Sequence, residues 1–221
     1  MSDFFLGCIS GIGQVIVGYP FDTVKVRIQN NATTKNMKFS HYYRGMTYPL
    51  ISSSIINAIV FGTYYNSLEY TNNRFLSGML SGTCCTPVLY FFDIFKTKRQ
   101  MNEKVSIKSI TQSKGLTTTF LRENIAFGIY FSTYDYLRDQ NYSAFLSGGI
   151  AGILNWTATY NLDVIRNRQI ANNISFENAF KLGNLWKGYS VCIMRAFIAN
   201  AVGFTIYDEG KKLLNDNDNE D

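Results

Sequence analysis

Three stretches of the chain repeat one pattern of charges: Asp22-Thr-Val-Lys25-Val-Arg27, Asp93-Ile-Phe-Lys96-Thr-Lys98 and Asp163-Val-Ile-Arg166-Asn-Arg168. They recur at spacings of 71 and 70 residues, and each closes a long stretch without charge. An acid and a base three residues apart lie on one helical face, where each group can reach a neighbouring helix. The pattern therefore predicts three equivalent helices that end in the same charged step, with ion pairs arranged around an axis.

Two further landmarks recur with the same period. The first is a pair of glycines four residues apart, and the second is a basic residue followed by glycine: Gly7/Gly11, Gly78/Gly82 and Gly148/Gly152, then Arg44-Gly45, Lys114-Gly115 and Lys187-Gly188. Small residues at this spacing allow close helix contact. We therefore predict one domain over 1–221, built from two-helix repeats at 1–70, 71–140 and 141–214, with an acidic tail at 215–221.

Long runs of the chain carry no charged residue: 4–21, 46–68, 75–92 and 141–162. Their lengths suit tilted membrane spans, although the mean hydropathy of -0.06 is ordinary for a soluble protein. They are rich in Gly, Ser, Thr, Asn and Tyr, which is typical of helices that line a wet cavity. A soluble bundle is the alternative, but it needs charged outer faces. We therefore expect an all-α membrane protein with six tilted transmembrane helices in three pseudo-symmetric repeats around a central cavity.

The basic residues predict the topology. Of 21 Lys and Arg, 15 lie within 25–45, 96–114 and 166–187, the connections after the first helix of each repeat. Because loops rich in Lys and Arg stay on one side of a membrane, both termini should lie on the other side. The four cysteines show no pairing or ligand pattern, so we expect no metal and no cofactor. No nucleophile and base motif indicates an enzyme.

The stretch Pro20-Phe-Asp22-Thr-Val-Lys25-Val-Arg27-Ile-Gln29, the threefold period and the basic-glycine landmarks resemble the mitochondrial carrier family over nearly the whole chain. The resemblance implies a monomeric multi-pass protein of the mitochondrial inner membrane that works by alternating access. It implies a matrix gate of three ion pairs: Asp22 with Lys96, Asp93 with Arg166, and Asp163 with Lys25. Gln29 and Gln100 match the braces beneath these pairs, whereas Ile170, in the third position, cannot serve.

The resemblance also implies a cytoplasmic gate on the second helix of each repeat. Its motif is present twice, as Tyr134-Asp135-x-x-Arg138 and Tyr207-Asp208-x-x-Lys211. In the first repeat Tyr65 and Leu68 stand where an acid and a base belong, so Asp135 with Lys211 is the one complete pair. We therefore expect a resting preference for the state that is open to the cytoplasm.

The candidate substrate site is formed by charges deep within the predicted spans: Arg122, Glu123 and Arg195, with Ser52 at the equivalent place in the first repeat. An intramembrane ion costs ~3 kcal/mol unless it faces water or a partner. Arg122 and Glu123 are adjacent, and adjacent helix residues do not face one another, so we expect each to be free to meet another group. The alternative is that both merely neutralise other charges of the protein. The family resemblance implies that these positions contact the substrate.

The local sequences around Trp156, Arg195 and Pro49 resemble carriers of carnitine, acylcarnitine and basic amino acids, in which an Arg followed by an acid fills the second contact point. We therefore expect exchange of a zwitterionic or cationic solute. The alternatives are exchange of nucleotides or deoxynucleotides, and a non-transporting scaffold or proton leak. The expected partners are a small-molecule substrate and the lipid bilayer, including cardiolipin, with no nucleic acid polymer. The chain is compact, like carriers of large DNA viruses, for which the membrane is that of the host mitochondrion.

Overall fold

The computed structural model describes residues 2–33, 37–103 and 113–217, with the backbone alone at 2–8, 10, 54, 144, 145, 200, 201, 203–205, 207, 208 and 211–217. All regular structure in these residues is helical. The helices are α1 (Ser2–Gln29), α2 (Phe39–Tyr42), α3 (Thr47–Thr71), α4 (Arg74–Gln100), α6 (Leu116–Asp139), α7 (Ala144–Asn172), α8 (Phe176–Lys181) and α9 (Tyr189–Asn217). The expectation of an all-α protein is therefore confirmed for the described residues.

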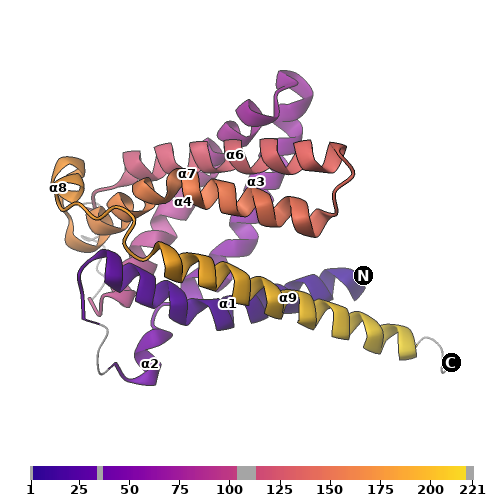
Figure 1. Cartoon of the computed structure of the whole chain (residues 1–221), viewed down its shortest axis with the longest axis horizontal. Helices are drawn as coiled ribbons and strands as arrows, with labels where there is room; N and C mark the ends of the chain where they lie inside the picture. Colours follow the sequence, from indigo (N-terminus) through magenta and orange to yellow (C-terminus); the bar gives the residue numbers. More distant parts are fainter. Residues whose placement is uncertain (1, 34–36, 104–112, 218–221) are drawn as a thin grey trace.

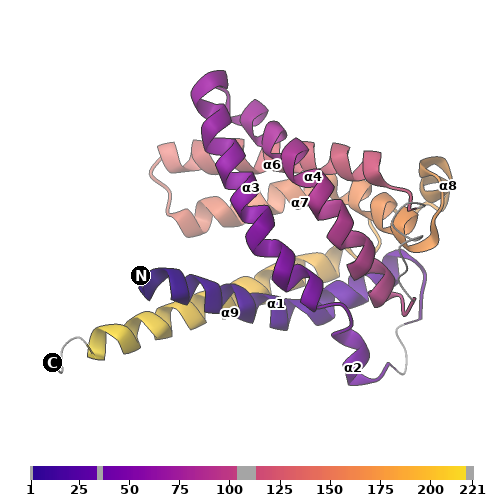
Figure 2. The same ribbon diagram turned by 180° about the vertical axis from the view of Figure 1, so that it is seen from behind.

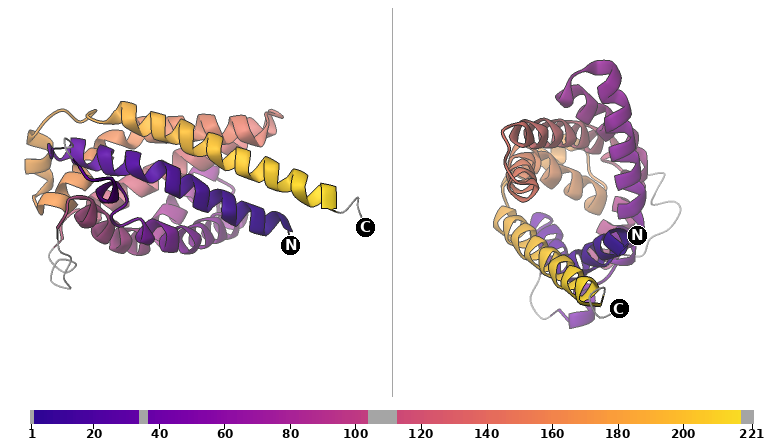
Figure 3. Two further views of the ribbon diagram at one scale, coloured as in Figure 1. Left: turned by 90° about the horizontal axis from the view of Figure 1, so that it is seen from below. Right: turned by 90° about the vertical axis from the view of Figure 1, so that its right-hand side faces the viewer.

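The long helices fall into two groups by their main contacts. Helices α3, α4, α6 and α7 each contact the next along the chain, and α1 packs against α9, so the first and last helices lie side by side (Figures 1 and 2). Seen from the end, the long helices lie around the periphery of the molecule (Figure 3, right). Both termini lie at one end, and α8 lies at the other (Figures 1 and 3).

Asparagine and serine residues set many of the helix boundaries. Asn72 adopts a left-handed conformation with φ 49° and ends α3, and the side chain of Asn73 then caps α4 by accepting from the backbone N of Leu76 at 3.1 Å. Ser143 caps α7 in the same way, through Leu146. Asparagine suits such positions because its short amide bonds locally and tolerates positive φ. The two-residue turn between α3 and α4 keeps these helices antiparallel neighbours.

The glycine pairs differ in what surrounds them. A Cβ on Gly82 would lie 2.7 Å from the backbone carbonyl of Glu123 on α6. A Cβ on Gly78 would lie closer still to the backbone carbonyl oxygen of Phe127 on the same helix. Among the described atoms, none that could obstruct a Cβ built on Gly11 or Gly152 lies within 4 Å of it. The expectation of close contact at every glycine pair is therefore wrong for Gly11 and Gly152. Helices α1 and α7 also pack on long neighbours, α9 and α6, so the difference is that Gly11 and Gly152 do not face these contacts, whereas Gly78 and Gly82 lie against the α6 backbone.

Hydropathy alone selects two membrane-spanning candidates among the described residues, Phe39–Thr71 and Arg74–Gln100. The remaining long helices carry more polar and charged side chains, many of them at the ends where the charge pattern recurs. By length and composition, therefore, only the segments that contain α3 and α4 qualify as candidate membrane spans among the described residues.

We expect Gly82→Ala to lower the free energy of unfolding by about 1 to 3 kcal/mol, because the added methyl group has to displace the α6 backbone. Gly152→Ala is the matched control. It adds the same group where there is open space, so stability should be unchanged or slightly higher. Thermal unfolding of the two variants in detergent measures the difference, and equal midpoints would contradict the close packing of α4 on α6.

Candidate functional site

Three ion pairs join the ends of α1, α4 and α7. Each connects an acid on one helix to a base on another: Lys96 Nζ to Asp22 Oδ2 at 2.8 Å, Arg166 Nη1 to Asp93 Oδ2 at 3.1 Å, and Lys25 Nζ to Asp163 Oδ2 at 2.7 Å. The three helices carry the repeated charge pattern at corresponding positions, so each acid reaches the base of a neighbour. The structure thus brings together the residues that the sequence pairs by position.

These charges are largely removed from solvent. Asp163 is fully buried, and Lys25 and Arg166 are 6% and 8% exposed. Arg166 also lies 3.2 Å from one oxygen of Glu123 and 3.2 Å from Asp163, so a single guanidinium contacts three carboxylates. Buried charges are tolerated only when partners compensate their lost hydration. Removing one member would therefore leave its partners uncompensated.

The two predicted brace residues lie differently. Gln29 donates from Nε2 to Asp163 at 3.2 Å and to the Tyr160 hydroxyl at 3.2 Å, and its Oε1 accepts from Asn167 at 2.7 Å. Gln29 thus contacts the Lys25 and Asp163 pair directly. Gln100 instead donates to Thr23 at 3.4 Å, and in the described part of the chain it makes no hydrogen bond to Asp22 or Lys96.

Ile170, in the third brace position, packs in an apolar cluster with Tyr90 and Ile94. The cluster replaces the polar contacts of a brace with hydrophobic contact between α4 and α7. The three brace positions therefore differ in chemistry, since two hold polar side chains and the third holds an apolar one.

Three tyrosines stand three residues before the three acids, and sequence reasoning missed them as a set. Each donates its hydroxyl to a backbone carbonyl in the following connection: Tyr19 to Arg44 at 2.8 Å, Tyr90 to Ser113 at 2.8 Å and Tyr160 to Lys187 at 3.1 Å. Their spacing of 71 and 70 residues, the same as that of the acids, is the sequence feature that could have identified them. These bonds fix the connections against the charged ends of the helices.

The last base of the repeated pattern binds helix ends. Arg168 is 1% exposed and donates to the carbonyls of Gln29, Ala179 and Gly183 at 2.9, 3.0 and 2.8 Å. Arg27 similarly donates from Nε to the carbonyl of Gln100 at 3.0 Å. Carbonyls at a helix C-terminus lack helical partners, and a guanidinium with five donors can satisfy several of them. These arginines therefore join the end of one helix to the next.

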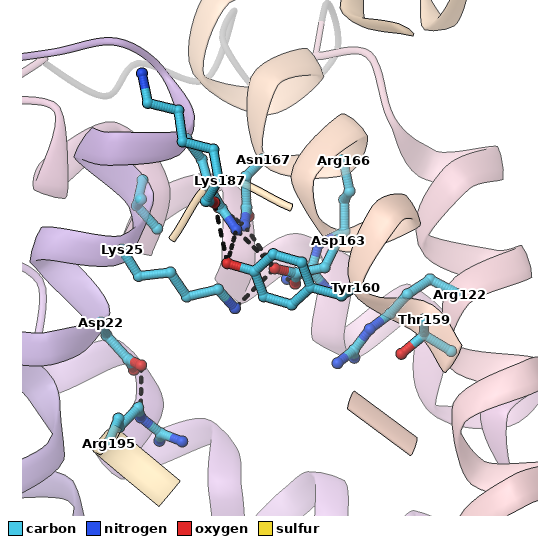
Figure 4. Close-up of polar contacts among 12 residues, drawn as sticks. Asp22, Lys25, Arg122, Thr159, Tyr160, Asp163, Arg166, Asn167, Lys187 and Arg195 are labelled. Atoms are coloured by element: carbon cyan, nitrogen blue, oxygen red, sulfur yellow. Dashed lines mark hydrogen bonds and ion pairs between the residues drawn. The ribbon is translucent and has the colours of Figure 1, made fainter. Parts of the chain in front are cut away.

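The candidate substrate residues lie directly against the ion pairs (Figure 4). Arg195 of α9 extends toward Asp22, with Nε 2.5 Å from Oδ1, while the other oxygen of Asp22 holds Lys96. In the same view the guanidinium groups of Arg195 and Arg122 point toward the space between them. Arg195 thus joins the ion pair of Asp22 with Lys96. Arg122 joins the other two ion pairs through Glu123 and Arg166, so the site residues and the ion pairs form two charged clusters of one network region.

The expectation that Arg122 and Glu123 stay apart is wrong. Arg122 Nη1 forms an ion pair with Oε1 of the adjacent Glu123, because a long guanidinium side chain can fold back along its own helix. Arg166 Nη1 contacts the same oxygen at 3.2 Å. Within the described residues no hydrogen bond or ion pair reaches Glu123 Oε2, and the residue is 1% exposed, so this oxygen of a buried side chain has no partner among them.

Ser52 of α3 is 5% exposed, and it makes no hydrogen bond that the described residues show. The structure therefore does not link it to Arg122, Glu123 or Arg195. Its assignment as a substrate contact stays a prediction.

At the opposite ends of the helices, Asp135 has partners that the sequence did not indicate. The Tyr64 hydroxyl donates to Asp135, and Arg74 lies 3.8 Å from Asp135 and 2.6 Å from Asp139. The remaining predicted residues of this gate are placed as follows: Tyr134 stacks on Tyr130, Arg138 donates to the Tyr142 carbonyl, and the side chains of Tyr207, Asp208 and Lys211 lie outside the described residues.

The profile of the family described as "Mitochondrial carrier protein" matches residues 1–74 and 138–218. This chain belongs to the mitochondrial carrier family. Members are transporters of small molecules, so the protein is a multi-pass carrier of the mitochondrial inner membrane and not an enzyme.

Several curated carriers are similar along most of their length. The "Mitochondrial basic amino acids transporter" of Rattus norvegicus is 29% identical over 91% of this chain and 86% of its own, and that of Bos taurus is 31% identical over 78% and 74%. The "Mitochondrial arginine transporter BAC2" of Arabidopsis thaliana is 28% identical over 96% and 91%. The carrier family and the branch that the sequence resembles are thus confirmed.

Removal of the Arg168 guanidinium should be severely destabilising. We expect Arg168→Met to lower the free energy of unfolding by about 3 kcal/mol or more, because three carbonyl partners lose their donor. Lys181→Met is the matched control, since Lys181 is exposed and forms an exposed ion pair with Glu177 within α8. Its stability should change by less than about 0.5 kcal/mol. Similar thermal unfolding midpoints for both variants would refute this role of Arg168.

Proposed function

We propose that the carrier exchanges zwitterionic or cationic solutes of the basic amino acid class by alternating access. The observation that carries the proposal is a site with two chemically distinct ends. Arg195 offers a cation beside Asp22, and Glu123 offers a carboxylate oxygen to which no described residue binds. The names of the rat, bovine and Arabidopsis relatives, which refer to basic amino acids and arginine, support this substrate class.

Charge balance supports the orientation of the substrate. Arg195 and Lys96 share the single carboxylate of Asp22, so this part of the network has an excess of positive charge. The part around Arg166 is balanced, because the cations Lys25, Arg122 and Arg166 contact the acids Asp93, Glu123 and Asp163. A substrate carboxylate is therefore best placed at Arg195, and a substrate cation at the unpaired oxygen of Glu123.

The proposed architecture is six tilted helices in three pseudo-symmetric repeats, 1–70, 71–140 and 141–214, in one domain around a central site. Support comes from the cyclic order of the ion pairs among α1, α4 and α7 and from the tyrosines at the same period. Because the site is built within one chain, the carrier works as a monomer. Lipids surround it, and acidic cardiolipin suits its basic connections.

The three ion pairs between α1, α4 and α7 act as the matrix gate, with Gln29 as a brace. In this structure all three pairs are formed, which supports its assignment to a state closed to the matrix. The cytoplasmic gate would then pair Asp135 with Lys211 in the other state. Here Asp135 is held instead by Tyr64 and Arg74. Release of Asp135 from these two residues would accompany closure on the cytoplasmic side.

Exchange of nucleotides is a weaker second candidate. Two arginines deep in the site suit phosphates, but Arg122 is already paired with Glu123. The carboxylate of Glu123 would also repel a phosphate.

Arg195→Ala should lower exchange of arginine by reconstituted liposomes at least about tenfold, because the substrate carboxylate loses its cation. Arg195→Lys should restore little, since an ammonium cannot reproduce a planar guanidinium that serves both Asp22 and the substrate. The control is Lys181→Ala, which removes an exposed cation on α8 that pairs with Glu177. Uptake by both Arg195 variants that matches the control would refute the assignment.

Glu123→Gln distinguishes the two substrate classes. For a cationic solute the change removes the counter-charge, so arginine and lysine exchange should fall about tenfold or more. For a nucleotide it removes repulsion and should preserve or raise uptake. Parallel uptake assays with arginine and a nucleotide provide the measurement, and higher nucleotide exchange by the variant would reverse the proposed substrate.

A further inference from the structure

One aromatic ring lies close to two cations of the network. The indole of Trp156 on α7 has Lys25 Nζ at 4.3 Å from its centroid and Arg122 Cζ at 4.9 Å. The two cations come from α1 and α6, and Figure 4 shows them extending into the site from opposite sides. The face of an indole carries negative charge density and attracts cations within about 6 Å. Trp156 is therefore a shared partner of both.

The helical spacing of α7 explains why the ring lies there. Trp156 stands four residues before Tyr160, so both rings project from the same face of the helix. Lys25 Nζ is also 5.3 Å from the centroid of Tyr160, and beyond these rings it reaches Asp163. At the corresponding positions of the other two segments, Val15 and Thr86 have no ring. The shared aromatic contact is thus a feature of the third segment.

The two cations belong to different parts of the proposed mechanism. Lys25 is a base of the matrix ion pairs, whereas Arg122 holds Glu123 at the candidate substrate site. Both are buried, and like charges that share so little water repel each other strongly. An indole near both lowers this cost and restrains where each cation points.

We propose that Trp156 is a positioning residue that keeps Arg122 on one oxygen of Glu123 and thereby leaves the other oxygen for the cationic end of the substrate. A free guanidinium prefers a bidentate fork that covers both oxygens of a carboxylate. Here Arg122 binds Oε1, the oxygen that Arg166 also contacts. Without the indole, Arg122 would be free to close over Oε2 and compete with the substrate. This substrate role rests on the proposed function.

The transport test compares Trp156→Phe and Trp156→Leu in reconstituted liposomes. The KM for arginine should rise about fivefold to tenfold in Trp156→Leu and less in Trp156→Phe, which retains a weaker ring. Adding Arg122→Lys to Trp156→Leu should restore much of the affinity, because an ammonium cannot cover both carboxylate oxygens. A merely structural role of Trp156 predicts no such rescue. An unchanged KM in Trp156→Leu, or no rescue by Arg122→Lys, would overturn the proposal.

A second measurement does not depend on transport. The chain has two tryptophans, Trp156 and Trp186, so Trp186→Phe leaves Trp156 as the single indole emitter. In that background Arg122→Gln and Lys25→Gln should each change the emission of Trp156, and the exposed control Lys181→Gln should not. The two cations are changed in separate variants. If one variant fails to fold, the emission of Trp156 in the other variant still tests the contact.

The outcomes distinguish failure of the contacts between Trp156 and the two cations from failure of the proposed function. A wild-type carrier that exchanges no amino acid would refute the proposed function, while the emission of Trp156 still decides whether the ring contacts both cations. Emission that responds to arginine but to neither Arg122→Gln nor Lys25→Gln would assign the ring to direct substrate contact. That result would overturn its role as a positioning residue.

Discussion

The cost of burying charge governs this structure. Carboxylates and cations at the ends of α1, α4 and α7 are stable away from water only because each has a partner on another helix. This constraint fixes which helix ends meet, since a shift of one helix would leave charges on two others unpaired. It also makes the network responsive to a charged ligand, because a substrate that enters must take a place among charges that are already matched.

The helix ends are held by a second set of contacts. Arg168 and Arg27 donate to the last carbonyls of neighbouring helices, and three tyrosines bind the connections that follow. These neutral and charge-assisted bonds do not compete with the acids. They therefore join the helix ends independently of the ion pairs.

The segments are equivalent in outline and differ in detail. Gly78 and Gly82 bring α4 onto α6, whereas open space surrounds Gly11 and Gly152. Gln29 contacts the ion-pair network, and Ile170 makes apolar contacts in the position that corresponds to a brace. Trp156 contacts two cations from a position where Val15 and Thr86 stand in the other segments. A substrate with two different ends requires such asymmetry, because a strictly threefold site would present identical groups.

The sequence by itself determined the helical class and the three equivalent charged helix ends, whereas the pairing of each acid with its base was implied by the family resemblance. The equivalent ends follow from the residue period, since equal spacing places Asp22, Asp93 and Asp163 at equivalent points. Only the tertiary structure decided how Arg122 meets Glu123, why Arg195 reaches Asp22, and where Tyr64 binds Asp135. Long side chains have many rotamers, and their choice depends on charges and rings that other helices bring near. Periodicity specifies positions along a helix, but only the packed assembly specifies which of several nearby partners a side chain takes.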